Sequence, residues 1–90
     1  SSVWQVEELA KLARTLGSPS GEAMLREDLH RLAAALEQLG EADRTIIRLI
    51  HIDGLTHVDV SQRLNCTIQQ SRSRLFRALV RLSSLLRDAK

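Results

Sequence analysis

The sequence predicts an all-α fold: a small domain of four to five helices that ends in a helix-turn-helix without a wing. Three observations support this class. The 90 residues suit one small domain. Hydrophobic residues make up 43%, mostly Leu and Ala, with 2% aromatics and one Pro, a composition that favours helices over sheets. Apolar residues also recur at spacings of three and four along most of the chain, which is the helical period.

The first predicted helix covers residues 2–16. Ser2 is placed to cap it, and Trp4 near its start is expected to be a packing anchor. Its apolar side consists of Val6, Leu9, Leu12, Ala13 and Leu16. A linker of sequence GSPSG follows at residues 17–21. We therefore divide the chain into an N-terminal helix with its linker, residues 1–21, and a main domain, residues 22–90.

The second predicted helix covers residues 22–39 and ends at Gly40. Its apolar positions repeat by four and three: Leu25, Leu29, Leu32, Leu36 and Leu39. The pattern resembles a coiled-coil seam, but it spans barely two heptads. Packing inside the domain is therefore expected.

The third predicted helix covers residues 42–53, with Gly54 at its end. Its inward residues are Ile46, Ile47, Leu49 and Ile50. Arg44 and Arg48 lie one turn apart on the outer side. Two interpretations remain open for them: contact with DNA phosphates, or a solvated face.

The last two predicted helices form the helix-turn-helix. Each begins with a capping box, in which a Thr and an acidic or amide side chain three residues later satisfy each other's backbone N–H; the pairs are Thr56 with Asp59 and Thr67 with Gln70. Between them Asn65, which tolerates left-handed backbone geometry, ends the first helix after Leu64. Such a unit often places its second helix in the DNA major groove.

The final helix has two distinct sides when projected at 100° per residue. The inward side contains Ile68, Ser71, Leu75, Leu79, Leu82 and Leu86. The opposite side contains Gln69, Gln70, Ser73, Arg77 and Arg81, and the flanks contain Arg72, Arg74 and Phe76. A buried Ser71 hydroxyl needs a partner, and the Thr67 carbonyl one turn earlier is a candidate.

The charges are distributed unevenly. The formal net charge is +2, but residues 1–60 hold six Lys or Arg against ten Asp or Glu, whereas residues 61–90 hold seven against one. A basic end on an acidic body indicates directed contact with a polyanion. Gln, Ser and Arg side chains are suited to bases and phosphates. Phe76 has two open interpretations, a ring covering a neighbouring helix or a contact with a thymine methyl group.

A family resemblance rests on an ordered set of short motifs. They are Leu39-Gly40, Arg44, residues 46–50, Gly54-Leu55-Thr56, Asp59-Val60-Ser61, Leu64-Asn65, Gln69-Gln70-Ser71, Ser73-Arg74-Leu75 and Arg77-Ala78. In this order and without gaps, residues 32–86 resemble region 4 of bacterial RNA polymerase sigma factors of the extracytoplasmic-function (ECF) group. Three departures stand out: Gln69-Gln70-Ser71 where the family has Gly-Thr-Val, Ser61 where it has a small apolar residue, and Gly40 where it has Pro. These departures bear on promoter preference more than on the fold.

The resemblance implies a function. Region 4 recognises the promoter minus-35 element, docks on the flap of the polymerase β subunit, and in many members is held inactive by an anti-sigma factor. Carried over by position, direct DNA contacts fall on Arg72, Ser73, Phe76 and Arg77. Geometry adds Gln69 and Gln70, with Arg74 and Arg81 as phosphate partners. Residues 1–21 would then connect two domains of a larger sigma factor.

The sequence offers little for other chemistry. His30, His51 and His57 lack the Cys or carboxylate spacing of a zinc site, and no phosphate loop or nucleophile elbow is present. We therefore expect no enzyme, metal or cofactor. His57 is interpreted as a surface histidine or a phosphate contact.

The expected location is the cytoplasm. Cys66, the single cysteine, is read as a small core residue, and a lone thiol suits a reducing compartment. No apolar run approaches a membrane span, and no signal peptide pattern is visible. The missing initial Met suggests a fragment of a longer chain.

Two other functions stay open. A sigma-like mimic could keep this fold and bind only an anti-sigma factor, an idea that the altered Gln69-Gln70-Ser71 segment favours. The effector domain of a response regulator contains a similar helix-turn-helix and would form a symmetric dimer on a palindrome.

Overall fold

The computed structural model describes residues 4–16 and 26–88 of the 90-residue chain. This part of the chain contains five α-helices, one short π-helix and no strand. The elements are α1 (Val6–Thr15), α2 (Arg26–Gln38), α3 (Glu41–Ile47), η1 (Arg48–Ile52), α4 (His57–Leu64) and α5 (Ile68–Asp88). The prediction of a small all-α domain ending in a helix-turn-helix is confirmed.

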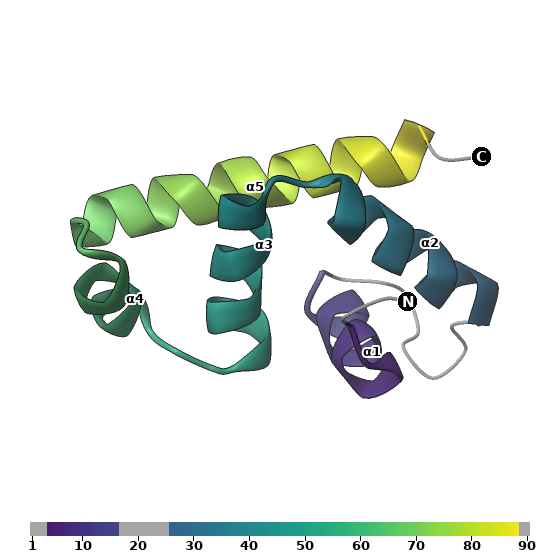
Figure 1. Ribbon diagram of the computed structural model, residues 1–90, viewed down its shortest axis with the longest axis horizontal. Coiled ribbons are helices and arrows are strands. Elements are labelled where there is room, and N and C mark those ends of the chain that lie inside the picture. The colour runs from purple at the N-terminus through teal and green to yellow at the C-terminus, as the bar shows by residue number, and fades with distance from the viewer. Residues whose placement is uncertain (1–3, 17–25, 89–90) are drawn as a thin grey trace.

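Helix α5 is the longest element and runs along one edge of the molecule, with the other helices on one side of it (Figure 1). Helices α2, α3 and α4 each pack against α5, while α1 packs on α2 and η1. The residues buried at the centre come from every α-helix: Leu12, Leu36, Ile46, Ile47, Val60 and Leu82 are almost completely inaccessible. One continuous core therefore connects α1 with the helix-turn-helix.

The two predicted capping boxes are present. The Thr56 hydroxyl accepts from the Asp59 N–H at 3.1 Å, and the Asp59 carboxylate accepts from the Thr56 N–H at 3.2 Å. Thr67 and Gln70 make the equivalent pair, both at 2.9 Å. Asn65 has the predicted left-handed conformation, with φ of 54°. The turn between α4 and α5 is thus specified by local hydrogen bonds.

The third helix differs from its prediction. A single helix was expected over residues 42–53, but the chain forms α3 and then the π-helix η1. In η1 the Asp53 N–H donates to the Arg48 carbonyl at 2.9 Å, a five-residue step. The sequence does not reveal this wider turn, because the spacing of its apolar residues is the same as the spacing expected for an α-helix.

The first helix begins later than predicted. It starts at Val6, not at residue 2, because the Gln5 N–H donates to the Glu8 carboxylate at 3.0 Å and closes the first turn there. The proposed Ser2 cap, the linker at residues 17–21 and the predicted start of the second helix at residue 22 lie outside the described residues.

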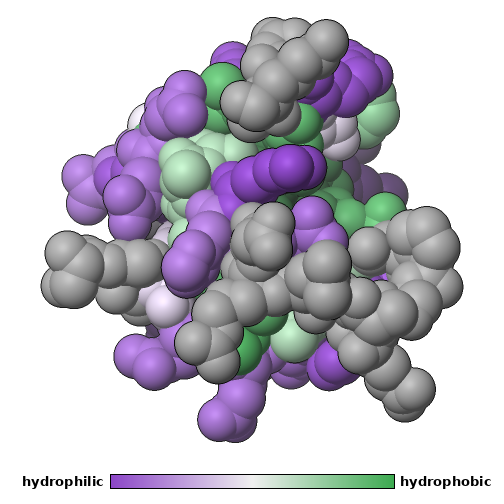
Figure 2. Space-filling model, turned by 90° about the vertical axis from the view of Figure 1, so that its right-hand side faces the viewer, coloured by the Kyte–Doolittle hydropathy of each residue, from purple (hydrophilic) through white to green (hydrophobic). Residues whose placement is uncertain are grey.

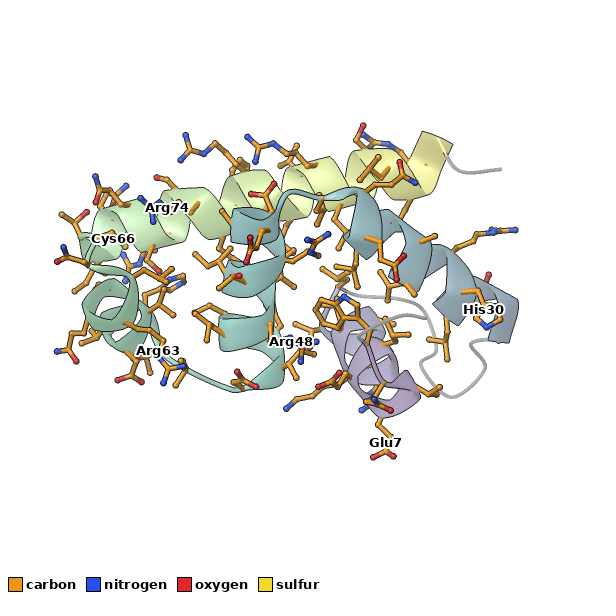
Figure 3. All side chains as sticks on the ribbon, viewed as in Figure 1. Glu7, His30, Arg48, Arg63, Cys66 and Arg74 are labelled. Carbon is orange, nitrogen blue, oxygen red and sulfur yellow. The ribbon has the colours of Figure 1, made fainter. Side chains whose placement is uncertain are left out.

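Arg44 and Arg48 are structural rather than solvated or directed at phosphates. Arg44 donates to the Glu37 and Leu39 carbonyls, each at 3.0 Å, so it caps the end of α2. Arg48 forms an ion pair with Glu8 at 2.8 Å and lies 4.3 Å above the centre of the Trp4 ring. In Figure 3 its side chain lies between η1 and α1. Arg48 therefore attaches the first helix to the rest of the core.

The surface at the α2 end of the molecule is mixed. Figure 2 shows hydrophilic side chains over most of its described part, with hydrophobic atoms exposed in patches between them. Among the described residues, no helix combines the length and hydropathy that crossing a membrane requires.

The Arg48 contacts lead to a stability prediction. We expect Arg48→Met to lower the free energy of unfolding by about 1 to 2 kcal/mol, because it removes an ion pair and a cation–π contact in a partly shielded position. Denaturant titration followed by fluorescence measures this, since Trp4 is the only tryptophan. The control is Arg31→Met, which breaks only the exposed 3.9 Å contact with Asp28. Equal effects of the two substitutions would contradict the prediction.

Candidate nucleic-acid interface

The buried side of α5 fixes which of its side chains face solvent. Leu75, Ala78 and Leu82 are buried, and Leu79 and Leu86 are partly buried against the same core. The prediction for Ile68 is wrong: the helical period places it on the inward side, but its side chain is 41% exposed. At 100° per residue Ile68 lies at the edge of the buried arc, and Ala78 lies inside that arc instead.

The predicted contact residues lie on the remaining surface of this helix. Gln69, Gln70, Arg72, Arg74, Phe76, Arg77 and Arg81 are exposed, and Ser73 is half-buried. Their positions from 69 to 81 span about 18 Å at 1.5 Å per residue. Figure 3 labels Arg74 in the first half of α5 and Cys66, which is half-buried, in the turn before it. The fold therefore brings these eight residues together on one element, with none sealed inside.

Phe76 faces solvent. Its ring is 68% exposed, and Val80 one turn later is 50% exposed. An aromatic ring this exposed buries little of its apolar area against a neighbouring helix. The reading of Phe76 as a cover for another helix is therefore not supported, and the ring is available for contact with a partner.

An open groove of about 620 Å³ lies between the first turn of α3 and the exposed flank of α5. Arg74, Arg77 and Arg81 line one wall, and Glu41 and Asp43 line the other. The Arg81 guanidinium donates to both oxygens of Asp43, at 2.9 and 2.8 Å. A predicted phosphate partner is thus already held by a carboxylate across the groove.

Asp43 was not singled out from the sequence. It lies in the first turn of α3, where an acidic residue is expected on helix-dipole grounds alone. Its pairing with Arg81 spans 38 residues. No local pattern could have identified a contact of that separation.

The Ser71 hydroxyl has a different partner from the expected one. It lies 2.7 Å from Nδ1 of His57, not on the Thr67 carbonyl, which accepts only from the Ser71 backbone N–H. His57 is half-buried and its Nδ1 contacts Ser71, so it is not a plain surface residue, and a phosphate contact stays a prediction. The first turns of α4 and α5 therefore meet through a polar contact.

His51 lies in η1 and is half-buried. Burial of its ring, and next the nearby His57, lower the pKa of His51 below its usual value of 6.5. Within the described residues, its buried Nε2 has no hydrogen-bond partner. A histidine in this setting favours its neutral form.

Nothing resembling a metal centre is found in the described ranges 4–16 and 26–88, where no cluster of three or more His, Cys, Asp or Glu could hold an ion. His30 on α2 lies far from the helix-turn-helix (Figure 3). The exposed surface of α5 offers amide, hydroxyl, guanidinium and aromatic groups, a set suited to binding rather than to bond making.

Fold and surface together define a helix-turn-helix domain of the nucleic-acid-binding class. A comparison with family models assigns the domain to a family: the model Sigma-70, region 4 matches residues 29–82, more than half of the chain. The chain belongs to this family, and it is accordingly a DNA-binding domain of transcription initiation and not an enzyme. No curated protein and no solved structure gives a significant match.

The shifted pKa of His51 predicts a pH dependence of stability. As the pH falls below 6.5, the unfolded chain binds a proton that the folded chain resists. The free energy of unfolding should therefore decrease from pH 6.5 down to the lowered pKa of the folded state. We expect His51→Leu to weaken this decrease and to raise the melting temperature at neutral pH, because the buried ring nitrogen is removed. Thermal unfolding between about pH 5 and 8 tests this. His30→Leu, at an exposed position on α2, is the matched control, and a pH profile unchanged in His51→Leu would refute the assignment.

Proposed function

We propose that this chain is the minus-35 recognition module of an ECF sigma factor, and that α5 reads the promoter through its first half. The observation that supports this is the row of exposed polar, basic and aromatic side chains on the face of α5 opposite its buried residues. The family match supports DNA binding in transcription initiation; the promoter element and the ECF group are part of the proposal.

The proposed base contacts come from the first turns of α5. Gln69 and Gln70 are the first exposed polar side chains of α5, and a glutamine amide pairs in bidentate fashion with adenine. Arg77 suits the two acceptors of guanine, and Phe76 suits a thymine methyl group. Ser73 is small and half-buried, which lets the helix approach the floor of the groove. The major groove, about 12 Å wide, admits a helix in this manner.

The proposed phosphate contacts flank this row. Arg72 and Arg74 lie on either side of the face and have exposed guanidinium groups. Arg81 is a weaker candidate, because its Nη1 already donates to Asp43, which partly neutralises its charge. In this arrangement, contacts with the DNA phosphates orient α5, and the central residues of the row contact the bases and so recognise the sequence.

The proposed partners follow from the family. Within a sigma factor the domain would dock on the β-subunit flap of RNA polymerase in the cytoplasm, and an anti-sigma factor would restrain it. A second function, binding to an anti-sigma factor without promoter recognition, is favoured by one observation: Phe76 and Val80 form an exposed apolar pair within the basic helix. The family match argues against a response-regulator effector domain.

Two binding measurements separate these functions. Gel-shift assays with a duplex selected from a random-sequence library test promoter-type recognition. Pull-down with a helical anti-sigma protein tests the mimic. Retention by the anti-sigma protein, with no duplex selected over competitor DNA, would favour the mimic over DNA recognition.

One prediction of the proposed function concerns Arg77. We expect Arg77→Ala to lower affinity for the selected duplex about tenfold, because it removes a base-edge contact. Arg87→Ala is the control: it removes the same charge from an exposed position about 15 Å further along α5. Fluorescence anisotropy measures both. Wild-type affinity should fall steeply with salt through counterion release, so a salt-insensitive affinity would count against the proposal.

Another prediction of the proposed function concerns Asp43. We expect Asp43→Asn to raise DNA affinity about two- to fivefold and to steepen the salt dependence by nearly one counterion, because Arg81 is released to a phosphate. Asp53→Asn, at an exposed position after η1, makes the same change in net charge without touching Arg81. If both variants bind alike, the pairing does not restrain Arg81.

A further inference from the structure

Besides sharing the apolar core, the two helices of the helix-turn-helix are connected at two places. The first is the turn itself, in which the Cys66 N–H donates back to the Ser61 carbonyl of α4 at 2.9 Å. The second connection is the contact between Nδ1 of His57 and Oγ of Ser71, at 2.7 Å. It links the first turn of α4 to the first turn of α5, fourteen residues apart in sequence. Neither helix can then roll about the turn without breaking this contact.

The hydroxyl of Ser71 lies in a position that demands a partner. Ser71 has an exposed fraction of 0% and is the one buried polar side chain among those that the structure describes. A buried hydroxyl without a hydrogen bond costs free energy that an apolar residue of similar size avoids. The sequence nevertheless has Ser here and His at the facing position, so their pairing is more directional than apolar packing would be.

We propose that His57 is a positioning residue for DNA reading, which acts by fixing the orientation of α5 relative to α4 through Ser71. Ser71 lies directly between Gln70 and Arg72, two of the proposed contact residues. Any roll of α5 that breaks the hydrogen bond therefore displaces those side chains from the bases and phosphates they reach. The DNA-binding consequence rests on the proposed function, whereas the orientation of α5 does not.

The hydrogen bond can be tested, because some substitutions of His57 should retain it and others should remove it. Asparagine places an amide group close to the position of Nδ1, so His57→Asn retains the hydrogen bond. Glutamine places its amide near Nε2 instead, so His57→Gln loses the bond at similar polarity and size. Ser71→Ala removes the other partner with the smallest change in volume. Circular dichroism controls for helix content in each variant.

The first measurement is the ratio of affinities for the selected duplex and for a scrambled duplex. We expect His57→Gln and Ser71→Ala each to reduce this ratio about tenfold, mainly through the selected duplex, and His57→Asn to preserve it. The double variant His57→Gln/Ser71→Ala should lose no more than either single variant, because both break one interaction. A purely structural role would lower the free energy of unfolding and leave the ratio of the folded protein unchanged, which would overturn the proposal.

The second measurement needs no DNA. Spin labels at Gln62→Cys on α4 and Ser83→Cys on α5, both exposed positions, report the distance between the helices in a Cys66→Ser background. We expect a narrow distance distribution in the reference protein and in His57→Asn, and a broader or shifted one in His57→Gln and Ser71→Ala. Unchanged distributions would overturn the inference. If the distributions change but no duplex is selected, the role of His57 in orienting α5 stands and the DNA-binding proposal fails.

Discussion

The burial of one side of α5 is the constraint on which the rest of the structure depends. Leu75, Ala78 and Leu82 lie against the shared core, and Ala78 is small enough for a neighbouring helix to approach closely. Because 3.6 residues complete a turn, burying these three positions also decides which of the other side chains on the helix point away from the core. The basic and amide residues face outward for that reason. The set of side chains exposed on this surface is therefore a consequence of packing.

The arginines divide into two groups according to what lies within their reach. Arg44 and Arg48 find carbonyls, a carboxylate and an aromatic ring inside the molecule, and both serve the attachment of neighbouring helices. Arg74 and Arg77 extend from α5 beside an open groove, and neither has an ion pair within the described part of the chain. Arg81 is intermediate, since Asp43 holds it while it remains largely exposed. A count of basic residues does not distinguish these groups.

Most local features were predictable from the sequence, whereas the π-turn of η1 and the contacts between distant residues were not. Both capping boxes and the left-handed Asn65 follow from neighbouring residues, and the inward stripe of α5 follows from its period except at Ile68 and Ala78. The pairings of His57 with Ser71 and of Asp43 with Arg81 depend on the tertiary arrangement. A buried serine signalled that some partner must exist, but not which one. The division of the chain at residue 21, the DNA contacts and the polymerase and anti-sigma partners remain predictions.

The π-turn in η1 has a geometric consequence for everything after it. A π-helix is equivalent to an α-helix that has accepted one additional residue, and each residue of an α-helix advances the chain by about 100°. The direction in which the backbone leaves η1 towards Gly54 and α4 therefore differs from that of a regular α-helix. The difference is a rotation of about 100° around the helix axis. A variant of this chain without the additional residue would need compensating changes in the loop at residues 53–56 to hold α4 and α5 in the same orientation. An insertion or deletion in this short stretch would therefore change the orientation of α5, although α5 begins sixteen residues after the end of η1.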